Sequence, residues 1–348
     1  MENNKTFPAP GNQPDHSILV VGPSWVGDMV MAQSLFKVIK ANQPDVRIHV
    51  LAPAWSEPVL DRMPEVAENI EMPVDHGALQ WGMRRKLGSD LKNKNFDQAI
   101  VLPGSLKSAL VPWFAGISKR TGYVGEQRWG LLNDIRRLDK AVLPLNAERY
   151  VALGLGKSEP IPATIPFPDL QINRTERDAA LNSLGLSLNK PVTALCPGAE
   201  YGPSKRWPAQ HFAEVARQKK SEGWYVWIFG SEKDVEVANE INRLSGNGCI
   251  NLCGKTRLGE VIDLMSCARY VVTNDSGLMH VAAAVGCYVI ALYGSTSDAF
   301  TPPLTDHCDR LNLNLECSPC FKRECPLGHM NCLNDLVPEM VLDKMIND

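Results

Sequence analysis

Short apolar runs alternate along the chain with longer stretches in which apolar residues recur at helical spacing. The first run, SILVVG at residues 17–22, is apolar throughout, which is typical of a strand buried on both faces of a parallel sheet. A helix is predicted next, at residues 29–41. Further strands are predicted at residues 47–52, near 69–73 and at 98–103, with helices at 57–63, 79–92 and 106–114. This succession predicts a doubly wound α/β sheet.

A second series of the same kind follows a proline-rich stretch. Four prolines fall between residues 160 and 168, and the helical spacing weakens there, as expected of a connection between domains. Strands are then predicted at residues 192–196, 225–230, 251–253 and 270–273, with helices at 209–222, 234–244 and 258–268. The sequence therefore predicts two α/β domains that face a cleft. Ligands of such sheets bind outside the carboxyl ends of the strands.

These patterns set the expected domain boundaries. The N-terminal domain is assigned to residues 17–165, the linker to 166–190, the C-terminal domain to 191–332 and a last helix to 333–348, with Pro338 in its first turn. Residues 1–16 are polar and rich in proline, and are predicted to be a disordered tail. They lack the apolar core of a signal peptide, and no run of about 18 apolar residues occurs, so a cytoplasmic protein is expected.

The segment YVVTNDSGLMHVAAAVGCYVIALYG, residues 270–294, is predicted to form a strand, a tight turn, a helix and a second strand. Gly277 in the turn lets the main chain approach a ligand, and the free N–H groups at the start of the helix suit a phosphate or a pyrophosphate. His280, one turn into the helix, is expected to point to the same place. Two alternatives stay open: Asn-Asp-Ser is also an ordinary helix cap, and a histidine between Met279 and Val281 also suits a core position.

Two other turns carry candidate residues. The loop PGAEYGPSKRWP, residues 197–208, places Ser204 and Lys205 at the carboxyl end of a predicted strand, where they could reach phosphate oxygens. Asp28 stands at the start of the first helix, whose dipole keeps a carboxylate ionised, and could accept a proton from an attacking hydroxyl. For Ser204 and Lys205 the alternative is a solvated loop, and for Asp28 it is an ordinary helix cap.

The motifs that are missing narrow the chemistry. The turn GPSWVGD, residues 22–28, has neither G-x-G-x-x-G nor G-K-[ST], which disfavours a dehydrogenase or a kinase. No Asp-x-Asp pair occurs, so the two-carboxylate Mg²⁺ site of many sugar-nucleotide enzymes has no candidate. The charge of a departing pyrophosphate would then be met by cations and backbone N–H groups.

The composition is that of a soluble globular enzyme with an uneven distribution of charge. At 348 residues the chain exceeds what one hydrophobic core usually supports, and 44% of its residues are hydrophobic and 22% charged. The formal charge is −3, yet residues 79–140 hold twelve Lys or Arg against five Asp or Glu. A basic face suits a polyanionic partner or a membrane surface, although a solvated helix face explains any single cluster equally well.

Three motifs together resemble one family. GPSWVGDMVMAQSL (22–35), PGAEYGPSKRWP (197–208) and TNDSGLMHVAAA (273–284) resemble the ADP-heptose:lipopolysaccharide heptosyltransferases of glycosyltransferase family 9, and the first motif is closer to the type II members. The resemblance implies a GT-B fold of two Rossmann-like domains. It implies an inverting transfer of L-glycero-D-manno-heptose from ADP-heptose to heptosyl-Kdo-lipid A at the cytoplasmic face of the inner membrane, with peripheral membrane contact and without nucleic acid.

The resemblance also implies roles for single residues. Asp28 matches the general base, and Lys205 matches the lysine that contacts the donor phosphates. Asp275, Gly277 and His280 match the donor-binding segment, and the main chain at Ser276 and Gly277 would hold the departing diphosphate. No cofactor is implied for catalysis. Two rival interpretations share the α/β alternation: another sugar-nucleotide enzyme, and a two-domain sugar-binding module, which would normally be exported.

All ten cysteines lie beyond residue 195, and in a reducing compartment thiols or metal ligands are expected rather than a disulfide framework. Cys317, Cys320, Cys325 and Cys332 fall within sixteen residues. Thiolates at this spacing suit a structural zinc or iron site. Related autotransporter heptosyltransferases carry a comparable iron-binding cysteine finger, whereas some members with the type II motifs lack such a cluster. Paired disulfides and unligated thiols are the open alternatives.

Overall fold

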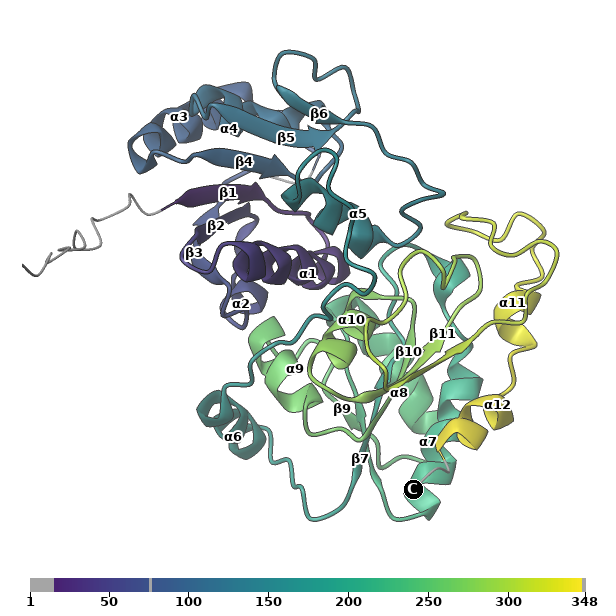
Figure 1. Cartoon of the computed structure of the whole chain (residues 1–348). Helices are drawn as coiled ribbons and strands as arrows, with labels where there is room; N and C mark the ends of the chain where they lie inside the picture. Colours follow the sequence, from purple (N-terminus) through teal and green to yellow (C-terminus); the bar gives the residue numbers. More distant parts are fainter. Residues whose placement is uncertain (1–15, 75–76, 346–348) are drawn as a thin grey trace, which may run out of the picture.

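The computed structural model describes residues 16–74 and 77–345, and consists of two six-stranded sheets, one in each half of the chain (Figure 1). The first sheet contains β1 (Ser17–Val21), β2 (Arg47–Ala52), β3 (Val66–Glu71), β4 (Gln98–Val101), β5 (Lys119–Tyr123) and β6 (Asp134–Arg136). The second contains β7 (Val192–Cys196), β8 (Tyr225–Ile228), β9 (Ile250–Asn251), β10 (Tyr270–Asn274), β11 (Tyr288–Leu292) and β12 (Cys308–Leu311). Neighbouring strands of each sheet are parallel.

The two sheets share one topology. The first has the order β3-β2-β1-β4-β5-β6, and the second, read from its other edge, has the equivalent order β9-β8-β7-β10-β11-β12. The order reverses between β1 and β4 in the first sheet and between β7 and β10 in the second. A crevice for ligands opens at such a reversal. The predicted fold class, two Rossmann-like doubly wound sheets, is confirmed.

Helices cover both faces of each sheet (Figure 1). In the first half these are α1 (Val26–Asn42), α2 (Glu57–Leu60), α3 (Trp81–Leu91), α4 (Leu110–Phe114) and α5 (Asn146–Gly154). In the second half they are α6 (Arg174–Ser183), α7 (Ala209–Ser221), α8 (Val235–Leu244), α9 (Leu258–Met265), α10 (Gly277–Ala284), α11 (Asn331–Asn334) and α12 (Pro338–Leu342). Helices α1 and α10 bury most of their residues because they pack against each other across the boundary between the halves. Within the described ranges, no helix is long and apolar enough to cross a membrane.

Some elements differ from the sequence pattern. Strands β5, β6 and β12 and helices α5 and α6 were not predicted. Helix α6 lies inside the segment 166–190 assigned to the linker, and it buries only Ala180 and Leu181, so its apolar pattern is weak. The segment assigned to one last helix instead contains the end of α11 and the short α12, which packs on α7. Residues 1–15 of the predicted tail, and 346–348, lie outside the described residues.

Candidate functional site

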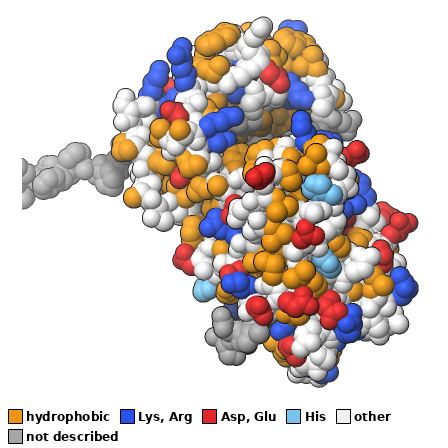
Figure 2. Space-filling view, turned by 90° about the vertical axis from the view of Figure 1, so that its right-hand side faces the viewer, with side chains coloured by type: hydrophobic (Ala, Val, Ile, Leu, Met, Phe, Trp, Pro, Cys, Tyr) orange, Lys and Arg blue, Asp and Glu red, His pale blue; other side chains and the backbone are white. Residues whose placement is uncertain are grey.

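A cavity of about 1360 Å³ lies between the two halves, at the carboxyl ends of both sheets. The loops that follow β1, β2 and β4 line it from the first half, and the loops that follow β7, β10 and β11 line it from the second. Figure 2 shows Lys and Arg side chains around the hollow between the two halves. Because ligands of doubly wound sheets bind at this end of the strands, the cavity is the candidate active site.

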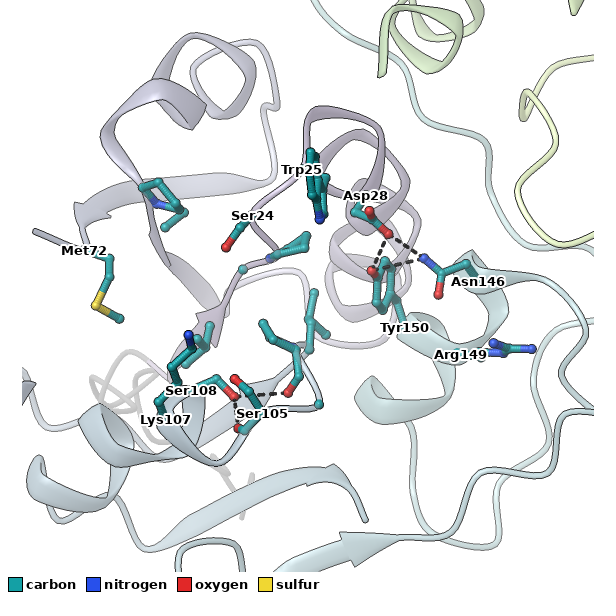
Figure 3. A pocket seen from close by; sticks show the side chains of 18 of the residues that line it. Ser24, Trp25, Asp28, Met72, Ser105, Lys107, Ser108, Asn146, Arg149 and Tyr150 are labelled. Carbon is teal, nitrogen blue, oxygen red and sulfur yellow. Dashed lines mark hydrogen bonds between the residues drawn. The ribbon is translucent and has the colours of Figure 1, made fainter. Parts of the chain in front are cut away.

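Asp28 lines this cavity from the first turn of α1. Its Oδ1 accepts hydrogen bonds from Asn146 Nδ2 at 2.7 Å and from the Tyr150 hydroxyl at 2.9 Å (Figure 3). Asn146 and Tyr150 lie one turn apart on α5, which packs along α1. Two donors on one oxygen fix the carboxylate and leave its second oxygen for a ligand. Sequence reasoning missed both donors, because α5 itself was not predicted; their spacing of four residues, which puts them on one face of a helix, was the only signal.

The surroundings of Asp28 change its basicity. Burial raises the pKa of its carboxyl group above the usual value for aspartate, and the charge of Asp275 raises it further. The hydrogen bonds from Tyr150 and Asn146 and the charge of Lys205 act in the opposite direction and lower this pKa. The net direction is upward, which makes Asp28 a better proton acceptor than a solvated aspartate. Burial and the adjacent carboxylate hold the pKa of Tyr150 well above its usual range, so its hydroxyl keeps its proton and remains a donor.

The variant Tyr150→Phe tests the assignment of Asp28 as the proton acceptor, through the pH dependence of kcat/KM. The hydroxyl lowers the pKa of Asp28, so its removal should raise that pKa further. A base is active only when deprotonated, and the acid limb of kcat/KM should therefore move to higher pH. The measurement is a pH profile of kcat/KM. Tyr225→Phe, which removes an exposed hydroxyl bonded to Asn189, is the matched control and should leave the limb in place. An unshifted limb in Tyr150→Phe would contradict the assignment.

Lys205 reaches the cavity from the second half. Its Nζ lies 2.6 Å from Oδ2 of Asp275, which is buried at the start of the turn before α10. The Thr296 hydroxyl donates to the same oxygen at 2.5 Å, and the Lys205 ammonium lies 5.0 Å from the centre of the Tyr201 ring. The residues predicted as base and phosphate ligand, Asp28 and Lys205, thus face one cavity from opposite sheets. Asp275 serves first as the counter-ion of Lys205.

The start of α10 packs against α1, whereas the sequence predicted that it faces a ligand. Neither Ser276 nor Gly277 nor His280 is among the residues that line the cavity. A Cβ on Gly277 would lie 2.9 Å from Cβ of Val26, and one on Gly27 would lie 2.5 Å from Cδ2 of His280. These glycines therefore let α1 and α10 meet, where the sequence suggested that Gly277 makes room for a ligand. Burial lowers the pKa of His280 to about 4, so its ring is neutral at physiological pH and packs between the two helices.

Ser204 is buried and hydrogen-bonded within the second half. It is 1% exposed, its hydroxyl donates to the carbonyl oxygen of Lys322 at 2.5 Å, and its oxygen also lies 3.0 Å from Oγ of Ser295 in a second hydrogen bond. It does not line the cavity that Asp28 and Lys205 share. Contact between the Ser204 hydroxyl and phosphate oxygens stays a prediction, since the hydroxyl is hydrogen-bonded to Lys322 and Ser295 in this structure.

Cys317, Cys320, Cys325 and Cys332 line one small cavity of about 20 Å³ beside Ser204. All four are free thiols. Backbone N–H groups of residues 327–330 lower the pKa of Cys325, whereas burial and the other three thiols raise that of Cys332. Among the described residues, however, no group of three or more His, Cys, Asp or Glu side chains is placed so that it could hold a metal ion. The four thiols therefore share a cavity without forming a ready ligand set for the predicted zinc or iron.

Part of the basic stretch in the first half is internal. Arg84, Arg128 and Arg136 are buried and donate hydrogen bonds to main-chain carbonyl oxygens. Arg120 does the same with the carbonyls of residues 117 and 131. The half-buried Lys107 differs, because its ammonium lines the cavity across from Asp28 without an ion-pair partner among the described residues (Figure 3). The positive charge available to a ligand is therefore smaller than the sequence count suggests.

The chain is similar to proteins of one known family. Residues 84–331 match the model of glycosyltransferase family 9 (heptosyltransferase). The chain is 48% identical to lipopolysaccharide heptosyltransferase 2 of Escherichia coli K12, over 94% of this chain and 97% of that protein. It is 44% identical to lipooligosaccharide heptosyltransferase 2 of Haemophilus influenzae, over 94% and 98%. The solved structure of E. coli ADP-heptose LPS heptosyltransferase II superposes with a TM-score of 0.84 at 45% identity, covering 94% of this chain and 97% of that one.

Proposed function

The chain belongs to glycosyltransferase family 9, the heptosyltransferases, and on this premise we propose that it transfers L-glycero-D-manno-heptose from ADP-heptose to the heptosyl-Kdo-lipid A inner core of lipopolysaccharide. The observation that carries the proposal is the similarity to heptosyltransferases 2 along nearly the whole chain, with a carboxylate and a lysine facing one interdomain cavity. The E. coli neighbour is named for ADP-heptose, which supports the choice of donor.

The proposed mechanism is a single displacement. Asp28 removes the proton from the acceptor hydroxyl, while Asn146 and Tyr150 hold its carboxylate in place. The acceptor oxygen attacks the anomeric carbon as its bond to the diphosphate breaks, so the configuration at that carbon inverts. Lys205 faces the same cavity and balances the charge of the departing ADP. We assign the compensation of the diphosphate charge to this lysine and assign no metal to the chemical step.

The acceptor is proposed to bind on the first half of the molecule. Its phosphate and carboxylate groups need cations, and Lys107 lines the cavity there without an ion pair within the described part of the chain. On the outer surface nearby, Trp81 and Trp113 are 48% and 42% exposed, and Arg85 and Lys86 follow Trp81 on α3. Aromatic and basic side chains of this kind suit a lipid interface. We therefore propose peripheral contact with the cytoplasmic face of the inner membrane and no role for nucleic acid.

The proposal is tested by following ADP release. Purified protein is incubated with ADP-heptose in the presence and absence of heptosyl-Kdo-lipid A. Rapid ADP release that requires the acceptor, together with a heptose mass added to the lipid, is expected of the transferase. Release without acceptor would indicate another sugar-nucleotide enzyme, and binding without release would indicate a sugar-binding module. Either result would overturn the proposal.

Zinc or iron at Cys317, Cys320, Cys325 and Cys332 stays a prediction. If the thiols ligate a structural metal, freshly purified tag-free protein should carry about one zinc or iron per chain by inductively coupled plasma analysis. The double variant Cys317→Ser/Cys320→Ser should lose it, because two thiolate ligands are gone. A metal content near zero in the unaltered protein would contradict the prediction and agree with the absence of a ready ligand set among the described residues.

A further inference from the structure

The cysteine loop, residues 317–332, lies directly against the lysine loop, residues 197–208. The backbone N–H of Ser204 donates to the carbonyl oxygen of Arg323 at 3.2 Å, and its side-chain hydroxyl donates to that of Lys322 at 2.5 Å. Ser204 is almost fully buried. The residue that directly precedes Lys205 is therefore held through both its main chain and its side chain by a segment about 120 positions later in the sequence.

A second set of contacts holds the lysine loop two to three residues earlier, at Tyr201 and Gly202. The Tyr201 hydroxyl donates to the carbonyl oxygen of Phe321 at 2.8 Å. The Tyr201 ring lies 5.0 Å from the Lys205 ammonium and 5.6 Å from the Arg323 guanidinium, so it stands between the two loops. At Gly202 an added Cβ would lie 2.5 Å from the carbonyl oxygen of Arg323, which shows how closely the main chains approach.

The cysteine loop is in turn fixed to the second sheet. Phe321 donates its N–H to the carbonyl oxygen of Ser295 at 2.7 Å, and the Ser318 hydroxyl donates to that of Gly294 at 2.5 Å. Gly294 and Ser295 follow β11. The four cysteine thiols and Ser204 line the same small cavity. A continuous set of contacts therefore runs from the sheet through the cysteine loop to the residue before Lys205.

We propose that the cysteine loop is the positioning element for Lys205, holding the lysine loop through Ser204 and Tyr201 so that the ammonium faces the donor diphosphate. This inference rests on the proposed function, because it takes Lys205 as the diphosphate ligand. It gives Ser204, which does not line the donor cavity, a role in donor binding through Lys205, whereas Phe321 of the cysteine loop also lines that cavity. The lysine loop contains only one short 3-10 turn, Pro203–Lys205, and external bonds help it to hold one conformation, since each unfixed residue costs conformational entropy on binding.

The experiment measures ADP binding by isothermal titration calorimetry and donor kinetics for Ser204→Ala and Tyr201→Phe. Each substitution removes one side-chain hydrogen bond to the cysteine loop without changing the Lys205 residue itself, and Tyr201→Phe also keeps the aromatic ring. Each is expected to raise the Kd for ADP and the KM for ADP-heptose about three- to tenfold, with a smaller change in kcat. Ser245→Ala, which removes a buried hydroxyl bonded to Asn242 elsewhere in the second half, is the control and should leave both values unchanged.

A double-mutant cycle separates positioning from a general loss of stability. In a Lys205→Ala background, Ser204→Ala should cause no further rise in the Kd for ADP, because the group that it positions is gone. The inference would be overturned if Ser204→Ala raised the Kd for ADP equally in both backgrounds, or if neither Ser204→Ala nor Tyr201→Phe changed this Kd. The proposed function would still be supported in that case, provided that the unaltered protein releases ADP only with acceptor present. Failure of that release would instead contradict the proposed function itself.

Discussion

Asp28→Asn is expected to lower kcat by about 10²- to 10⁴-fold and to leave the affinity for ADP-heptose nearly unchanged. The amide cannot accept the proton of the acceptor hydroxyl, yet its oxygen can still accept the hydrogen bonds from Asn146 and Tyr150. Because burial raises the pKa of Asp28, the folded state holds this carboxylate against a desolvation cost. The neutral variant should therefore unfold at the same temperature as the unaltered protein or at a higher one.

Single-turnover kinetics, calorimetric donor binding and thermal unfolding measure these three quantities. The control is Asp45→Asn, which changes an exposed aspartate in the turn after α1 and should leave all three unaltered. A variant of Asp28 that turns over within about threefold of the unaltered rate would remove the assignment as general base. A variant that binds donor poorly would show instead that the carboxylate contributes to the donor site.

The positions of Asp28 and Lys205 could be predicted because both follow buried strands. The carboxyl ends of parallel strands lie at one edge of a sheet, so residues in the loops that follow such strands are expected at that edge. Asn146 and Tyr150 could not be placed in this way. They lie on a short helix far along the chain, and only the packing of α5 on α1 brings them to Asp28.

The orientation of side chains within the motifs depended on contacts that a linear pattern does not contain. Ser204 turns away from the cavity because carbonyl oxygens of the cysteine loop accept its hydrogen bonds. Gly277 lies against Val26 of the other half, and His280, which burial keeps neutral, lies against Gly27. Each of these partners lies at least 100 residues away in sequence. The motifs therefore identify the family and the main contact points, whereas tertiary packing decides which face of each motif meets the ligand.

Lys205→Ala is expected to have the other large effect, a fall in kcat/KM of about 10²- to 10³-fold together with a loss of stability. The substitution removes the cation that faces the diphosphate. It also leaves Asp275 buried, with Thr296 as its remaining hydrogen-bond partner among the described side chains. An unpaired buried carboxylate costs several kcal/mol, so the free energy of unfolding should fall by about 3 kcal/mol. Steady-state kinetics and denaturant unfolding measure the two losses separately.

The double variant Lys205→Ala/Asp275→Asn separates these two effects. Replacing the carboxylate by an amide removes the unpaired charge, so most of the stability should return, whereas kcat/KM should stay low because the diphosphate still lacks its cation. Lys233→Ala is the matched control. Its ion pair with Glu200 of the lysine loop is exposed on both sides, so stability should change by less than about 1 kcal/mol. If activity returned with stability in the double variant, Lys205 would be a structural partner of Asp275, and the diphosphate would have to be bound by another group.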